Sequence, residues 1–111
     1  MGRFVRAFAA VLLLLAPVVS PALGQETPEA FYRGKTVAIT VGSTPGGGYD
    51  FYARLLARHM GRFIPGGPTV VVRNMQGGGG NTAAAFIATV APKDGTNIGA
   101  IQAGNVTDQL T

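Results

Sequence analysis

The chain has 111 residues, 47% of them hydrophobic, and a net charge of +4, so it fits one small domain at most and is not a disordered charged tail. It has no cysteine and a single histidine, His59, which excludes a disulfide scaffold, a catalytic thiol and a multi-histidine metal site. Its nine Lys and Arg residues form no cluster that could neutralise a run of phosphates, so we expect no nucleic-acid partner.

The first 24 residues have the pattern of a secretory signal peptide. Arg3 and Arg6 precede an unbroken apolar run over 7–15, and prolines follow it. Ala22 and Gly24 supply the small residues of a cleavage site. The apolar run is shorter than the roughly 20 residues that a membrane-spanning helix needs. We therefore expect export, cleavage near Gly24 and no stable membrane insertion afterwards.

A first strand–loop–helix unit follows a polar lead-in that Phe31 and Tyr32 can hold against the fold. The β-branched run 36–41 predicts a strand, and the glycine-rich stretch 42–48 predicts a loop. The pattern over 49–60 predicts an amphipathic helix.

That predicted helix has two distinct faces. Its apolar stripe consists of Tyr52, Leu55, Leu56, Met60 and Phe63, with His59 among them. We expect His59 to pack there as a structural residue. Arg54, Arg58 and Arg62 repeat every four residues, which predicts a solvated face.

A second unit of the same kind comes next. The run 69–73 predicts a strand, and 74–80 predicts a loop with four consecutive glycines. Asn81 is the expected N-cap of a helix. The apolar positions of this helix are Ala83, Phe86, Ile87 and Val90. After a turn, 96–101 predicts a third strand, and we assign no element to 102–111.

Strands that alternate with helices predict βαβ units, a parallel sheet and the α/β class. A parallel sheet needs covering on both faces, which two helices on three strands provide poorly. The sequence therefore predicts the truncated front part of a larger α/β domain.

Glycine loops before two successive helices favour a binding site for a small anion. A helix N-terminus presents unpaired N–H groups, and glycine lets a ligand approach the backbone closely. Both loops should open at the carboxyl edge of the sheet, where such folds bind carboxylates or phosphates. The alternative is that the glycines only form tight turns. For Asp50 two roles stay open: a structural one, in which it complements the helix dipole or caps the helix, and a functional one, in which it orients the first loop or accepts a bond from a ligand ammonium.

Enzymatic patterns fit poorly, and we expect neither an enzyme nor a cofactor. The only serines are Ser20 and Ser43, and neither glycine loop ends in the Lys-Ser/Thr pair of a P-loop. Gly78-x-Gly80-x-x-Ala83 matches the dinucleotide fingerprint formally, but no acid follows at the end of the next strand. A fragment of an NAD-type α/β enzyme and a non-binding secreted structural domain are the alternatives.

An ordered set of motifs resembles one known family. Pro-Gly-Gly-Gly-Tyr-Asp at 45–50 leads into Ala-Arg-Leu-Leu-Ala at 53–57, and Val-Arg-Asn at 72–74 precedes the glycines 77–80. Ala-Pro-Lys-Asp-Gly-Thr follows at 91–96. Over 31–105 the chain resembles the start of the substrate-binding proteins of tripartite tricarboxylate transporters, also called the Bug family.

The resemblance implies a periplasmic, two-lobed solute receptor with lobes like those of type II periplasmic binding proteins. Residues 1–24 would be the signal peptide, and 25–111 part of the first lobe, its parallel-sheet βαβαβ start. Such receptors hold a small carboxylate through backbone amides and deliver it to the membrane components of a secondary transporter. The implied ligand-binding residues are Pro45, Gly46, Gly47, Gly48, Tyr49, Asp50, Gly78, Gly79, Gly80, Asn81, Ala103 and Asn105.

Overall fold

The computed structural model describes residues 24–104. The predicted signal peptide up to residue 23, and Asn105 with the residues after it, lie outside the described residues. The elements, in chain order, are α2 (Pro28–Tyr32), β1 (Thr36–Val41), α3 (Gly48–Met60), the 3₁₀ helix η2 (Gly61–Phe63), β2 (Thr69–Asn74), the 3₁₀ helix η3 (Gly78–Gly80), α4 (Asn81–Thr89) and β3 (Asn97–Ala100). Between residues 24 and 104 no helix is long and apolar enough to span a membrane.

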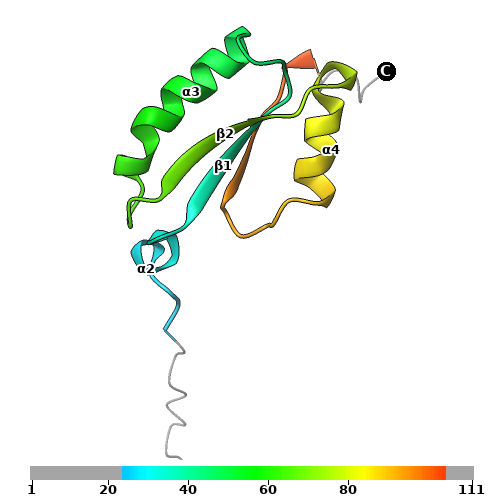
Figure 1. Ribbon diagram of the computed structural model, residues 1–111. Coiled ribbons are helices and arrows are strands. Elements are labelled where there is room, and N and C mark those ends of the chain that lie inside the picture. Colours follow the sequence, from blue (N-terminus) through cyan, green and yellow to red (C-terminus); the bar gives the residue numbers. More distant parts are fainter. Residues whose placement is uncertain (1–23, 105–111) are drawn as a thin grey trace, which may run out of the picture.

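The three strands form one parallel sheet in the order β2-β1-β3, which confirms the α/β class (Figure 1). β1 is the central strand: Ile39 pairs with Val72 on one side and with Ile98 on the other. From Val37 to Val41 every residue of β1 is buried. A strand covered on both faces is typically apolar along its whole length, which agrees with the mainly apolar, β-branched sequence of β1.

The two longer helices lie on opposite faces of this sheet (Figure 1). α3 packs on β1 and β2, where Ala53 contacts a core of Ile39 and Val41. α4 packs on β3 and β1 and buries Ala83. The crossover from β1 runs to β2, and the next one runs back past β1 to β3. Because both crossovers of a parallel sheet are right-handed, reversing direction places the second helix on the other face.

The lead-in is held to the sheet as expected, through a short helix that the sequence pattern did not predict. Thr27 caps α2 by accepting a hydrogen bond from the Ala30 amide at 3.2 Å. The Tyr32 hydroxyl donates to the Gly95 carbonyl at 3.1 Å, and the Lys35 ammonium lies 3.3 Å from the centre of the Phe31 ring. α2 is thereby joined to the turn that precedes β3.

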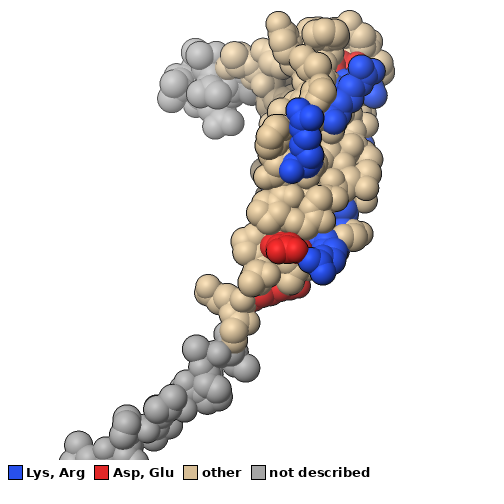
Figure 2. All heavy atoms as spheres, turned by 90° about the vertical axis from the view of Figure 1, so that its left-hand side faces the viewer, with Lys and Arg blue, Asp and Glu red and all other residues tan. Residues whose placement is uncertain are grey.

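Most of the predicted apolar stripe of α3 is wrong as a core face, although its member Met60 does pack against the core. The side chains that α3 turns toward the sheet are those of Asp50, Ala53, Ala57 and Met60. The small alanines let the helix approach the strands closely. The large hydrophobic side chains left exposed on and just after this helix are those of Tyr49, Phe51, Tyr52, Leu55, Leu56 and Phe63. Figure 2 shows this side of the molecule, which is largely uncharged, with Lys and Arg in separate groups.

His59 is also exposed, which contradicts its expected packing. It borders a shallow apolar hollow together with Tyr52, Leu55 and Leu56. These residues were grouped correctly on one face, but that face flanks the contact with the sheet instead of forming it.

Helix boundaries differ from expectation at both glycine loops. Asn81 is not the N-cap of α4: it is the first helical residue, and Gly80 occupies the cap position in the left-handed region with φ 101°. α4 ends at Thr89, so Val90 lies beyond it and is 68% exposed. α3 begins at Gly48 with Gly47 as its N-cap. The positive φ at Gly80 favours glycine, whereas the extended backbone of Gly47 (φ −76°) is open to any residue.

Gly42 allows the loops to meet at the carboxyl edge of the sheet. A β-carbon at this position would lie 2.7 Å from Gln102 Oε1 and 3.0 Å from the Gly80 Cα. The chain after β2 must pass the end of β1 to reach α4 on the opposite face, and it passes at Gly42.

We expect Gly42→Ala to lower the free energy of unfolding by about 1–3 kcal/mol, the usual cost of forcing a group into a packed site. Urea denaturation followed by circular dichroism measures this loss. Gly48→Ala is the matched control, because a β-carbon at Gly48 meets no atom within 4 Å. Equal midpoints for both variants would show that the close approach at Gly42 is not needed.

Candidate functional site

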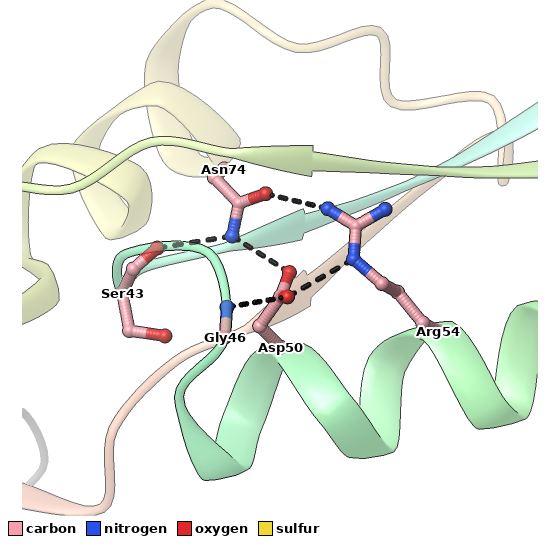
Figure 3. Close-up of polar contacts among 5 residues, drawn as sticks. All are labelled: Ser43, Gly46, Asp50, Arg54 and Asn74. Atoms are coloured by element: carbon pink, nitrogen blue, oxygen red, sulfur yellow. Dashed lines mark hydrogen bonds and ion pairs between the residues drawn. The ribbon is translucent and has the colours of Figure 1, made fainter.

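The carboxylate of Asp50 organises the loop that follows β1 (Figure 3). The residue is 3% exposed. Its Oδ2 accepts hydrogen bonds from the Gly46 amide at 2.9 Å and from Arg54 Nε at 3.0 Å. Its Oδ1 accepts a hydrogen bond from Asn74 Nδ2 at 2.8 Å. Both carboxylate oxygens are therefore engaged by protein groups.

Asn74, the last residue of β2, extends this arrangement to a second point of the loop. Its Nδ2 also donates to the Ser43 carbonyl at 3.1 Å, and its Oδ1 accepts from Arg54 Nη2 at 3.0 Å. Figure 3 shows the Asn74 side chain extending from β2 toward Asp50, with Ser43 on one side of it and Arg54 on the other. The loop is thus held at Ser43 and Gly46 by residues of two other elements.

These contacts favour the loop-orienting role among those considered for Asp50. Arg54, Arg58 and Arg62 are all exposed, as predicted for a solvated face. Arg54 has the additional role of ion-pair partner of Asp50, with about half of its side chain exposed (49%). The Asp50/Arg54 spacing of four residues is a signal that sequence reasoning could have used. For Asn74 there was no such signal, because its contacts depend on the pairing of β2 with β1.

The environment of Asp50 lowers its pKa from 3.8 to about 2. The largest cause is the hydrogen bond from Arg54, followed by those from the Gly46 amide and from Asn74. All three donors favour the charged form of the carboxylate, so Asp50 is ionised at neutral pH.

The N-terminus of α3 is open in front of this arrangement. Gly47 is its N-cap, with extended backbone (φ −76°, ψ 171°), and no side chain caps the helix. The amides of Gly48, Tyr49 and Asp50 belong to the first turn and therefore have no intrahelical acceptor. A β-carbon at Gly48 would meet nothing within 4 Å. An uncapped, sterically open helix start of this kind suits an anion.

The segment after β3 lies against the same region. Gln102 Nε2 donates to the Gly42 carbonyl at 3.1 Å, and the Ala103 amide donates to the Tyr49 hydroxyl at 3.3 Å. The hydrogen bond between Ala103 and Tyr49 brings two predicted site residues together. The crossover from β1 leads to one side of the sheet and the crossover to β3 leads to the other, so the chain reverses direction between β1 and β3. Open α/β sheets bind ligands at such a switch point.

The second glycine loop is shaped by four consecutive positive φ values, from Gly77 to Gly80. Only glycine adopts such a run of positive φ angles without strain. The Gly80 amide donates to the Gly77 carbonyl at 2.9 Å, so the loop turns back on itself. Gly80 is buried against Gly42, whereas Gly78, Gly79 and Asn81 are exposed. The two predicted loops therefore meet at their bases.

Beside α3 lies an apolar groove of about 490 Å³. Its walls come from Tyr49, Tyr52 and Leu56 of α3 and from Ile98 and Ala100 of β3. It runs from the N-terminus of α3 along the part of the sheet that this helix leaves uncovered, and no charged side chain lines it.

Within residues 24–104 no group of three or more His, Asp or Glu side chains is placed to hold a metal ion. No protein-family model, curated protein or solved structure matches the chain.

Acid should weaken the fold through Asp50. The pKa of Asp50 is about 2 in the folded chain and near 3.8 in the unfolded chain. Its contribution to the free energy of unfolding is therefore complete at pH values well above 3.8. That contribution declines as the pH falls through 3.8 and is lost below about 2. Urea unfolding at about pH 6, 4 and 3, which covers the onset and upper part of that window, should show this decline.

Asp50→Asn is the comparison for this experiment and should flatten the acid dependence. Part of the dependence of stability on acid should remain, because hydrogen bonds from the hydroxyl and the amide of Thr96 also lower the pKa of Asp94. An unchanged slope in Asp50→Asn would contradict the assignment to Asp50.

Removing the Asn74 amide should destabilise the loop that follows β1. Asn74→Ala deprives Asp50 Oδ1 and the Ser43 carbonyl of their donor. We expect a loss of about 1–3 kcal/mol in unfolding free energy, typical of buried polar groups left without partners. The exposed Gln76→Ala serves as control and should change it by less than about 0.5 kcal/mol. Similar effects of both substitutions, measured by urea denaturation, would mean that Asn74 does not hold the loop.

Proposed function

We propose that this chain forms part of an exported solute receptor that binds a small carboxylate. The observation that carries the proposal is the uncapped and open N-terminus of α3, located at the reversal between β1 and β3. The partial positive charge of a helix start and its unpaired amides favour an anionic group there.

The surroundings of this helix start favour a carboxylate held by backbone groups over an ion held by a basic cluster. Arg54 is engaged by Asp50 and Asn74. A single carboxylate needs only a few N–H donors, and charge-assisted bonds of this type are stronger than neutral ones. The pre-formed loop adds to affinity, because Ser43 and Gly46 are already held in place before any ligand arrives.

Export and delivery complete the proposal. The n-region, apolar run and cleavage site over 1–24 support secretion into the periplasm. The motifs at 45–50, 72–74 and 91–96 support a receptor of the tripartite tricarboxylate transporter type. In that role the loaded receptor would meet the membrane components of a secondary transporter. Gly48, Tyr49 and Asp50 would supply amides to the carboxylate, with Ala103 on the other side.

Removing a single amide donor tests the site with little disturbance of the helix. Gly48→Pro deletes the N–H at the first helical position, where proline is favoured, and the extended Gly47 before it is compatible with proline. Gly48→Ala retains the N–H and is the matched control. Isothermal titration with citrate, succinate and glutamate should show binding that falls roughly tenfold or more in Gly48→Pro, the scale of one charge-assisted hydrogen bond.

Two further measurements separate the alternatives. Arg58→Ala should leave the affinity unchanged, since Arg58 is exposed and lies on the side of α3 toward β2. Binding of NAD without binding of any carboxylate would favour a dinucleotide-binding enzyme. If none of these compounds binds, the remaining alternative is a non-binding structural domain.

A further inference from the structure

The side chain of the predicted site residue Tyr49 crosses the region between α3 and the segment after β3. Its backbone lies in the first turn of α3, among the amides proposed to bind the carboxylate. Its hydroxyl oxygen accepts a hydrogen bond from the Ala103 amide at 3.3 Å. Its ring forms part of the wall of the apolar groove. This single side chain therefore joins the two sides of the proposed site.

We propose that the Tyr49 hydroxyl is an internal stand-in for the ligand, which occupies the Ala103 amide until a carboxylate displaces it. This inference rests on the proposed function. It makes Tyr49 a residue that sets the affinity by competition, in addition to any contact that its own amide makes.

The geometry of the bond supports displacement. The N···O distance of 3.3 Å is longer than the most frequent distance for such bonds, which is about 2.9–3.0 Å. The phenolic oxygen is a neutral acceptor, whereas a carboxylate oxygen forms charge-assisted bonds that are about twice as strong. Tyr49 is 44% exposed, so its side chain is free to swing away from Ala103 without opening the core.

The rest of the segment stays in place when the hydroxyl leaves. Gln102 Nε2 donates to the Gly42 carbonyl at 3.1 Å, and this bond does not involve Tyr49. The Ala103 amide is thus presented to the ligand by a segment that remains attached at the end of β1.

The test is Tyr49→Phe, which keeps the ring and removes the hydroxyl. Citrate should bind roughly two- to tenfold more tightly to this variant, because a neutral hydrogen bond no longer has to be broken. Tyr52→Phe is the matched control: Tyr52 lines the same groove and is 70% exposed, and citrate affinity should not change. Equal or weaker citrate binding by Tyr49→Phe would overturn the displacement.

A measurement without ligand decides whether the bond itself exists. In Tyr49→Phe the Ala103 amide proton should resonate upfield of its position in the unmodified chain and exchange faster with solvent, while in Tyr52→Phe it should not change. An unchanged Ala103 amide in Tyr49→Phe would overturn the proposal. If citrate fails to bind even the unmodified chain, the proposed function falls and the displacement with it, but the amide signal still reports on the hydrogen bond.

Discussion

The buried carboxylate of Asp50 connects three parts of the chain that are distant in sequence or differ in structure. It accepts hydrogen bonds from the loop after β1, from α3 and from the end of β2. Removing a charge from water is costly unless hydrogen bonds and an opposite charge replace the lost hydration, and here Gly46, Arg54 and Asn74 supply both. The open start of α3 depends on this arrangement, because the loop that precedes it has no regular hydrogen-bonding pattern of its own.

The sheet order decides what that loop faces. With β1 in the centre, the chain after β2 must cross over the end of β1, and Gly42 and Gly80 meet at that point. The segment after β3 reaches the same edge, where Gln102 and Ala103 contact Gly42 and Tyr49. Backbone N–H groups from two separate parts of the chain thereby gather at one edge of the sheet. That convergence makes a ligand site possible at a place with few charged side chains.

The apolar side of α3 has the residues that its periodicity predicts, but most of its large side chains are exposed and do not pack against the core of the sheet. Tyr52, Leu55 and Leu56 do lie on one side of the helix, as their spacing predicts. The sheet instead contacts Ala53 and Ala57, because small side chains allow a closer approach, and Tyr52 and Leu56 are left to line the groove beside β3. Periodicity in the sequence identifies the apolar side of a helix, but packing decides which residues on that side contact the sheet.

Local signals in the sequence determined the class and most of the elements, but not the short helix α2. β-Branched runs specified β1 and β2, glycines marked both loops, and the alternation of strands and helices specified a parallel α/β sheet. The physics of helix starts favoured an anion site at the glycine loops, whereas the individual candidates at 45–50 were implied by the family resemblance. The contacts of Asn74, Gln102 and Ala103 could not be predicted, because each joins residues whose proximity depends on the order β2-β1-β3. Strand order is set by the crossovers and by long-range packing, so only the tertiary structure decided which amides and side chains share the carboxyl edge.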